Sequence, residues 1–336
     1  MRVILAAGTT DTAAIDGISA AGADPQLRYH TPSADAEIVT YGRPVLAPVV
    51  PVSPTGCPTP AVVTRAAREL LGFQWTTIDA GLAEPAGAPT VDLGVDPGDD
   101  VRDRIAVPDA DEIVERARAY AAGLDEDRIA IAETVPGGTT TAMGVLEALG
   151  ERAAVSSSLP ENPLDRKRSV VEAALDASDL SAGDLSNRPV PAIRRVGDPV
   201  QAVVLGLLLG ARESGTEVEL WGGTQQLAIL ALARHAGLAG SIPVATTTYV
   251  AEDDSAAVPA LAAEVDAELQ VTDPQFDRSD HVAMERFEAG EAKEGVGMGG
   301  ALAWIERAGA RDALRDRVTT VYDRLLENKE VAPGGH

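Results

Sequence analysis

The sequence predicts an α/β protein, with a doubly wound, mostly parallel sheet, helices on both faces and a small accessory lobe. Two observations carry this prediction. Short apolar runs alternate with longer stretches of helical spacing along most of the chain, and such alternation is typical of parallel strands joined by crossover helices. Glycine-rich turns also follow several of the apolar runs, as expected where a strand passes into a helix.

The N-terminal part contains two expected strands, two expected helices and two loops. Residues 3–7 are a short apolar run that predicts a strand, and the turn at residues 8–11 is expected to cap an amphipathic helix. A helix over residues 61–71 leads to a strand over 75–80, and glycines and prolines predict a loop over 81–98. Residues 36–60 are expected to be a partly extended segment over the core, because their prolines exclude helix; these are Pro44, Pro48, Pro51, Pro54, Pro58 and Pro60.

The same alternation continues through the rest of the chain, with helices expected from apolar spacing and strands from short apolar runs. A helix over residues 109–124 precedes a strand over 128–132, a helix over 142–149 and a strand over 153–157. Further helices are expected near 167–176 and over 199–212, 225–236 and 256–265, with strands over 217–221 and 242–246 between them.

Length and hydrophobic content set the domain organisation. A chain of 336 residues with 45% hydrophobic content can bury a sizeable core. We expect one α/β domain over residues 1–328, with an N-terminal lobe of about residues 1–100 and a flexible polar tail over 329–336. The apolar run at 202–210 is shorter than the roughly 20 residues needed to span a bilayer, and the N-terminus has no signal-peptide pattern. We therefore expect a cytoplasmic protein.

The charge balance is strongly acidic. Asp and Glu total 52 against 28 Lys and Arg, a formal net charge of −24, and the lysines are Lys167, Lys293 and Lys329. This composition favours a salt-rich cytoplasm, where a Debye length of about 3 Å at 1 M salt screens the repulsion. It argues against nucleic-acid partners and anionic membranes, which attract basic surfaces. An acidic interaction face is the less favoured interpretation.

Cysteine and histidine provide no metal-binding pattern. Cys57 is the only cysteine and lies in a turn-rich loop, so neither a disulfide nor a thiolate cluster is expected, and a structural role is the favoured interpretation. The histidines lack ligand spacing; they are His30, His235, His281 and His336. We expect no bound metal.

Four motifs follow expected strands or bends, and in an open α/β sheet the carboxyl ends of the strands meet at one ligand crevice. The first, E-T-V-P-G-G-T-T-T at residues 133–141, joins a strand to a helix start; such a loop either holds phosphate or only makes the turn. The others are residues 156–164 leading to Lys167, residues 222–225, and residues 293–300. Brought together, they suit a small phosphorylated ligand.

Two nucleotide-binding fingerprints are not supported. The glycines of residues 295–300 follow the polar segment 288–293 and not a strand, so they do not predict a dinucleotide site. The sequence G-x-x-x-x-G-K-[ST] is also missing from the chain, which argues against a nucleoside triphosphatase. No cofactor is expected.

The motifs resemble those of the nicotinate-nucleotide:dimethylbenzimidazole phosphoribosyltransferases of cobamide assembly, especially their archaeal branch, over about residues 125–310. The family pattern E-M-G-I-G-N-T-T aligns with residues 133–140. A lysine followed by V-V-E-x-A-L aligns with Lys167 and residues 170–175, and G-E-G-T-G-A-A-L-A aligns with residues 294–303.

Three positions differ from the family pattern. Asp198 replaces a glycine, Trp221 replaces an aspartate, and two extra residues lie between Glu294 and residues 301–303. The first 100 residues match the archaeal branch, including residues 17–23 and 31–37, but match the bacterial enzymes poorly. Because the bacterial N-terminal half contributes to the base pocket, the identity of the base is the most open part of this resemblance.

The resemblance implies transfer of phosphoribose from nicotinate mononucleotide to a benzimidazole-like base, without a cofactor, in a homodimer. Glu294 is then the general base, and Glu133 orients the base or stabilises positive charge on the ribose. The 5′-phosphate would be held by Gly137, Gly138, Thr139, Thr140 and Lys167. Further substrate-binding candidates are Ser157, Gly222, Gly223, Gly295 and Gly297.

Other interpretations stay open. Glu294 is alternatively an ordinary surface carboxylate, Glu133 a helix cap, and Lys167 incidental beside Arg166 and Arg168. His281 fits a structural hydrogen bond better than catalysis. A non-catalytic mononucleotide or sugar-phosphate binder of the same fold is the rival function, and a phosphoribosyltransferase with an unrelated acceptor is a third.

Overall fold

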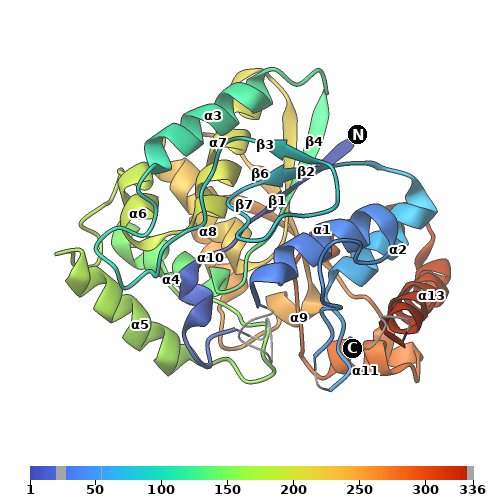
Figure 1. The fold of residues 1–336 in the computed structure, drawn as a ribbon. Coiled ribbons are helices and arrows are strands. Elements are labelled where there is room, and N and C mark those ends of the chain that lie inside the picture. The colour runs from blue at the N-terminus through green and yellow to red at the C-terminus, as the bar shows by residue number, and fades with distance from the viewer. Residues whose placement is uncertain (20–27, 54, 331–336) are drawn as a thin grey trace.

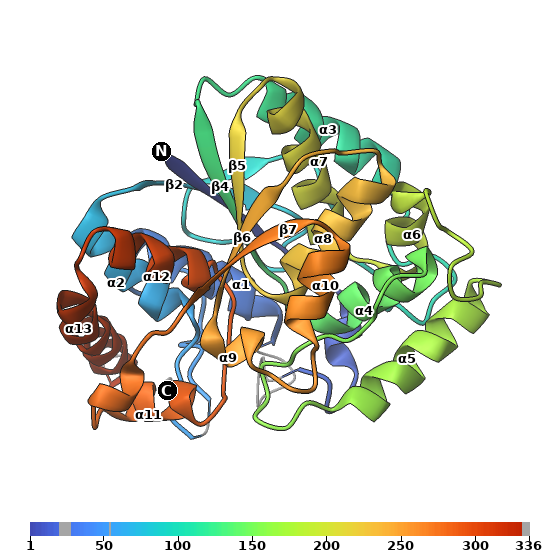
Figure 2. The same ribbon diagram turned by 180° about the vertical axis from the view of Figure 1, so that it is seen from behind.

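The computed structural model describes residues 1–19, 28–53 and 55–330, and it has the predicted α/β architecture. Within these residues, seven strands form one sheet in the order β3-β2-β1-β4-β5-β6-β7, with every pairing parallel. Figures 1 and 2 show helices on both faces of the sheet. The strands are β1 (Arg2–Ala7), β2 (Gln74–Asp79), β3 (Thr90–Asp92), β4 (Arg128–Thr134), β5 (Glu217–Trp221), β6 (Ile242–Thr247) and β7 (Ala267–Thr272).

Five of the six predicted strands are confirmed, and the expected strand over residues 153–157 is wrong. That segment lies outside regular secondary structure, although Val155, Ser156 and Ser157 are buried. Its apolar character therefore reflects burial without sheet pairing. The edge strands β3 and β7 were not predicted, since β3 is three residues long inside a glycine- and proline-rich loop and β7 alternates apolar with polar residues.

The helices cover both faces of the sheet (Figures 1 and 2). They are α1 (Thr31–Tyr41), α2 (Ala61–Leu71), α3 (Ala110–Ala122), α4 (Gly138–Leu149), α5 (Leu164–Ala177), α6 (Pro189–Val196), α7 (Pro199–Glu213), α8 (Thr224–His235), α9 (Thr248–Ala251), α10 (Val258–Glu264), α11 (Val282–Glu288), α12 (Met298–Arg307) and α13 (Arg311–Glu330).

Three expectations about helices need correction. The turn at residues 8–11 leads only into a single 3-10 turn, Asp11–Ala14, capped by the Thr10 side chain. Helix α1 includes residues 36–41 of the segment 36–60 that was expected to be extended. The first proline of that segment is Pro44, so the residues before it are free to be helical. Helix α13 continues to Glu330, so residues 329 and 330 are helical, while residues 331–336 of the expected tail lie outside the described residues.

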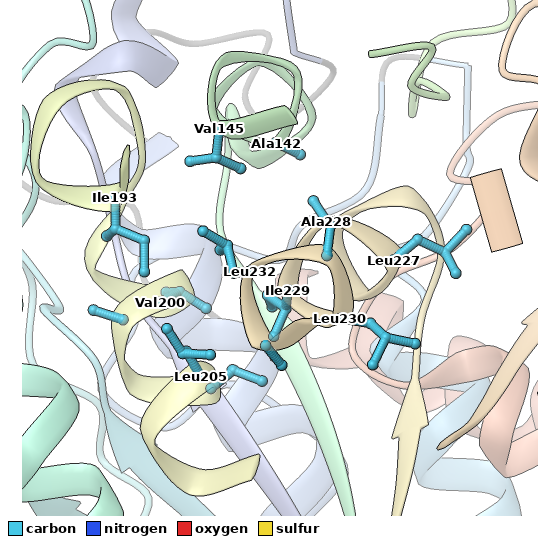
Figure 3. Close-up of a cluster of buried hydrophobic side chains, with 14 of the residues drawn as sticks. Ala142, Val145, Ile193, Val200, Leu205, Leu227, Ala228, Ile229, Leu230 and Leu232 are labelled. Carbon is cyan, nitrogen blue, oxygen red and sulfur yellow. The ribbon is translucent and has the colours of Figure 1, made fainter. Parts of the chain in front are cut away.

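The central strands are apolar on both sides because both faces of the sheet are covered. In β1, Ile4 and Ala6 join one buried cluster, to which α3, α4, α7 and α8 contribute. Val3, Leu5 and Ala7 join the opposite cluster, with α2, α12 and α13. Figure 3 shows α4, α6, α7 and α8 meeting in the first layer, with labelled side chains that include Val145, Ile193, Val200 and Leu232.

The strand order reverses direction between β1 and β4. From β1 the chain builds outward through β2 to β3, and then returns to the other side of β1 with β4 and continues to β7. At this reversal the two crossover connections leave on opposite faces, which opens a crevice at the carboxyl ends of the strands. Gly8, just after β1, donates its N–H to the carbonyl of Thr134 at 3.1 Å, so the ends of β1 and β4 meet there.

Candidate active site

A cavity of about 640 Å³ lies at the carboxyl end of β4. Most of its walls come from six parts of the chain that are distant in sequence, and several of these parts lie at element ends, where the sheet opens. These parts are α1, the proline-rich segment 44–60, residues 133–139 at the start of α4, residues 156–158, and the two segments 223–225 and 291–296.

All four motifs found in the sequence contribute to this cavity. Eight of the twelve predicted site residues line it: Glu133, Gly137, Gly138, Thr139, Ser157, Gly223, Glu294 and Gly295. The other four, Thr140, Lys167, Gly222 and Gly297, are not among the lining residues. Strand ends and glycine turns therefore identified the location of the cavity.

Glu133 is a buried carboxyl at the end of β4. It is held by the side-chain amide of Gln225 at the start of α8, whose Nε2 donates to Glu133 Oε2 over 3.1 Å. Loss of water contact, together with the nearby charges of Asp198, Glu294 and Asp35, raises the pKa of Glu133 to about 8. The raised pKa shifts this carboxyl toward its protonated form at neutral pH, and a positively charged group in the cavity would shift it back toward the ionised form.

Glu294 lies in the loop before α12 and also faces the cavity. Both of its carboxylate oxygens accept the backbone N–H of Gly299 at 3.0 Å, in the first turn of α12. Removal from water raises the pKa of Glu294 to about 8, although the N–H donors oppose the shift. A Cβ atom on Gly223 would lie 3.7 Å from Glu294 Cγ, so the turn after β5 packs against this side chain.

The glycines of the first loop are required by close approaches. Gly137 precedes α4 with a φ of +82°, a conformation that glycine adopts without strain. A Cβ atom on Gly138 would lie 2.0 Å from Gln225 Nε2, so a side chain at this position is incompatible with the Gln225–Glu133 hydrogen bond. The N-termini of α4 and α8 both reach the cavity, and helix N-termini favour anions.

Two lysines lie beside the segment 156–158, and only Lys293 lines the cavity. Lys167 is fully buried and donates from Nζ to the Ser156 carbonyl at 2.7 Å and to Asn162 Oδ1 at 3.1 Å. Burial lowers the pKa of Lys167 to about 7. Lys293 pairs with Asp253 at 2.7 Å, and Asp253 also accepts a hydrogen bond from Ser156 Oγ at 3.0 Å.

The remaining predicted residues have structural surroundings. Gly297 has a φ of +74°, and a Cβ atom there would lie 2.9 Å from Ala132 and 3.0 Å from the Trp221 ring. A Cβ atom on Gly222 would meet Gln226 Cγ at 2.7 Å. Thr140 is fully buried in the first turn of α4. Close packing therefore accounts for the two glycines, and burial accounts for Thr140.

The differences from the resembled family also have structural explanations. Trp221 is fully buried and packs edge-on against Trp304, with ring centroids 4.4 Å apart. It lies against the first turn of α12, because a Cβ atom on Gly300 would come within 2.0 Å of its ring. Asp198 caps α7 by accepting the Gln201 N–H at 2.9 Å, with its other oxygen held by the Thr141 hydroxyl.

Cys57 and His281 have the surroundings of structural residues. Burial raises the pKa of the Cys57 thiol to about 12, so it stays protonated at neutral pH. His281 caps α11, because its Nδ1 accepts the Ala283 N–H at 3.3 Å, and its ring meets Tyr322 edge-on.

Sequence reasoning did not assign roles to three cavity residues. Asp35 in α1 is buried and accepts hydrogen bonds from Thr59 Oγ1 at 2.6 Å and Thr134 Oγ1 at 2.8 Å. Gln225 and Lys293 were named only as members of motifs. Asp35 belongs to the segment 31–37 noted for its family resemblance, which was the one available signal for it.

The cavity combines three kinds of surface. Prolines and valines of segment 44–60, with Val250 and Val296, form an apolar wall. Four carboxyl residues, Asp35, Glu133, Glu291 and Glu294, line the same space, and the two helix N-termini with Ser157 and Lys293 provide anion-binding groups. This arrangement suits a ligand with a flat apolar ring, a cationic centre and an anionic group.

Over the described part of the chain, no three His, Cys, Asp or Glu side chains are grouped to hold a metal ion. None of the helices in that part is long and apolar enough to cross a membrane.

Comparison with known proteins gives close relatives in archaea, and no family model matches the chain. A UPF0284 protein of Halobacterium salinarum is 59% identical over 323 residues, covering 96% of this chain and 97% of the relative. A UPF0284 protein of Methanosarcina mazei is 43% identical over 323 residues, covering 94% of this chain and 93% of the relative. A UPF0284 protein of Thermococcus gammatolerans is 38% identical over 331 residues, covering 97% of this chain and 98% of the relative.

Two solved structures from Thermus thermophilus share the fold. One is CobT, with a TM-score of 0.59, and the other is described as nicotinate-nucleotide-dimethylbenzimidazole phosphoribosyltransferase, with a TM-score of 0.57. Each is 18% identical, and each match covers 99% of this chain and 86% of the other. The predicted fold and its resemblance to this enzyme group are confirmed at the level of architecture.

Proposed function

The chain belongs to the UPF0284 family, and from this premise we propose that it is a phosphoribosyltransferase acting on nicotinate mononucleotide and a benzimidazole-like base. The observation that carries the proposal is the meeting of Glu133 and Glu294 in a cavity that two helix N-termini also reach. The fold shared with the two Thermus structures supports it. The product would be an α-riboside 5′-phosphate for cobamide nucleotide-loop assembly.

The reaction exchanges one C–N bond for another. The bond between C1′ and the pyridinium nitrogen breaks, and its electron pair returns to that nitrogen, so nicotinate leaves without needing a proton. A ring nitrogen of the incoming base forms the new bond to C1′ from the opposite face. The base then carries one proton too many on its second ring nitrogen, and a carboxylate must accept it as the oxocarbenium-like transition state collapses.

Glu294 is the proposed general base. The Gly299 N–H holds both of its oxygens, which fixes the carboxylate plane. Because its pKa is raised to about 8, the ionised form is a stronger base than an ordinary carboxylate, and its pKa is close to the working pH of a proton acceptor. The positive charge of bound pyridinium favours that ionised form.

Glu133 is proposed to stabilise the positive charge that develops on the ribose. It is fixed by Gln225 at 3.1 Å, and its carboxyl belongs to the same cavity wall as the helix N-terminus of α4. An oriented carboxylate in a site that excludes water stabilises a developing cation more strongly than it would in water.

The 5′-phosphate is proposed to bind where the N-termini of α4 and α8 converge with segment 156–158. Gly137, Gly138, Thr139, Ser157 and Gly223 contribute to this region, and helix N-termini with glycine turns suit a phosphate. Gly295 belongs to the wall beside Glu294. Lys293 is the cavity-lining cation, and we propose that Lys167 acts indirectly by holding the Ser156 carbonyl.

The rival function, a non-catalytic binder of a mononucleotide or sugar phosphate, requires the anion-binding end of the cavity but no pair of carboxyls. The paired glutamates therefore favour the enzyme. We extend the proposal to a homodimer that works without a cofactor. Val45 and Leu46, apolar side chains exposed at 59% and 57% in the proline-rich segment, are the proposed dimer contact. Sedimentation in high salt tests the assembly, and a monomer would contradict it.

The proposed function is tested by incubating the protein in multimolar KCl with nicotinate mononucleotide and a panel of benzimidazoles, purines and phenols. Nicotinate release is followed by chromatography, and the riboside phosphate is identified by mass. Release that depends on a base establishes the transferase and identifies its acceptor class. Binding of nicotinate mononucleotide without release under any base supports the non-catalytic binder instead.

A further inference from the structure

Asp35 is a cavity carboxyl that has no part in the proposed proton transfer or in the proposed phosphate site. Its side chain lines the cavity from α1, and the residue is 2% exposed. Thr59 Oγ1 donates to Oδ1 at 2.6 Å and Thr134 Oγ1 donates to Oδ2 at 2.8 Å. Burial raises its pKa to about 7.

The two threonines fix the carboxyl plane but leave hydrogen-bonding capacity unused. A carboxylate offers about four lone-pair positions, and the threonines occupy one on each oxygen. A buried polar group with unused capacity is costly unless a ligand or water satisfies it. Asp35 is therefore prepared to accept a further hydrogen bond from a molecule in the cavity.

The surroundings of Asp35 indicate which part of a ligand would reach it. Thr59 lies between Pro58 and Pro60 of the apolar wall, all of which line the cavity. Pro60 in turn packs against Gly295, where a Cβ atom would lie 3.5 Å from its ring, and Gly295 adjoins Glu294. A flat base resting on this wall would thus have Glu294 near one edge and Asp35 near another.

We propose that Asp35 determines acceptor specificity by binding an N–H or O–H donor on the ring of the base. The preferred acceptor is then a fused-ring nitrogen heterocycle that carries an amino or hydroxyl group. A methyl group at that position cannot donate to the remaining lone pairs of the carboxylate, and a site built around a hydrogen bond discriminates against a base that lacks the donor. This inference rests on the proposed transferase function and specifies its substrate class.

The test compares 5-aminobenzimidazole with 5-methylbenzimidazole, two bases of nearly equal size, at pH 8, where Asp35 is ionised. Wild-type protein is expected to prefer the amino base by at least about tenfold in kcat/KM. Asp35→Asn keeps the shape but loses the charge and one of the two acceptor oxygens, so the hydrogen bond to the amino group weakens and the preference should fall several-fold. Asp165→Asn, on the exposed surface of α5, is the matched control and should keep the preference.

A merely structural role for Asp35 predicts a different result, because loosening the wall lowers kcat/KM for both bases by the same factor and leaves their ratio unchanged. Thr59→Val provides a second variant: it removes one hydrogen bond to Asp35 but keeps the carboxylate, so the amino preference should persist. Equal kcat/KM for the two bases in wild type, or an unchanged ratio in Asp35→Asn, overturns the inference.

Calorimetric binding of the two bases separates this inference from the proposed function. Absence of nicotinate release with every base would refute the transferase. Preferential binding of the amino base that Asp35→Asn weakens would still support the Asp35 site. Equal binding of both bases would refute it.

Discussion

The side-chain amide of Gln225 donates a hydrogen bond to the carboxyl of Glu133 over 3.1 Å, and this contact joins the start of α8 to the end of β4. It crosses directly over Gly138, where a Cβ atom would lie 2.0 Å from Gln225 Nε2. The glycine loop is therefore shaped by a side-chain contact as well as by the needs of a phosphate.

Substitution of Gly138 tests this relationship. Gly138→Ala should displace Gln225 and release Glu133, because the new methyl group occupies the position of the amide nitrogen. We expect kcat/KM for nicotinate release to fall by at least about tenfold, equivalent to the loss of one hydrogen bond to a charged group. Gly123→Ala, whose nearest contact is an ordinary 3.5 Å, is the control; equal activity of the two variants would refute the role of Gln225.

The central elements of the fold were predictable from local sequence, and the edges were not. β5 and α2 were predicted to the residue, since an apolar run or a helical apolar stripe specifies a central element. β7 alternates apolar and polar residues at the sheet edge, where side chains are only partly buried. The segment at 153–157 was mistaken for a strand because it is buried beside the cavity without pairing to the sheet.

The stability of the empty protein is expected to fall as pH rises from 5 to 7. The pKa values of Glu133 and Glu294 are both raised to about 8, so the folded state retains protons that the unfolded state releases near its ordinary value of 4.5. Their stabilising effect is complete below pH 4.5 and is lost as pH rises through 8. Each retained proton gives a slope of about 1.4 kcal/mol per pH unit.

This dependence is checked by melting temperatures measured at constant multimolar KCl. The double variant Glu133→Gln, Glu294→Gln should have a flatter profile between pH 5 and 7. Above pH 7 the comparison is confounded, because Lys167, with its pKa lowered to about 7, adds stability as pH rises toward 10.5. An identical slope in wild type and the double variant would show that these carboxyls are not buried as described.

The packing of Trp221 against α12 predicts a stability effect at Gly300. A Cβ atom there would lie 2.0 Å from ring atoms of a fully buried tryptophan, so Gly300→Ala requires the helix or the ring to move. We expect a loss of about 1–3 kcal/mol in the free energy of unfolding. Denaturant titration against Gly123→Ala measures it, and an unchanged midpoint would contradict the close packing.

The site was predictable as a location but not in its details. Glycine turns and the family resemblance made Glu133 and Glu294 the predicted catalytic residues, and both line the cavity. The burial of Lys167 behind Ser156 and the exposure of Lys293 to the cavity depend on tertiary packing, and sequence spacing does not distinguish the two lysines. The partners of Asp35, Thr59 and Thr134, are 24 and 99 residues away in the chain.

The most direct test of the account compares wild type with Glu294→Gln for base-dependent nicotinate release and, in parallel, for binding of nicotinate mononucleotide. The amide keeps the shape of the side chain and cannot accept the proton from the base. We predict at least a 100-fold loss of release, roughly the lower bound of a general base contribution, with binding retained within a few-fold. Equal release by both proteins, or binding by wild type without any release, would contradict the proposed mechanism.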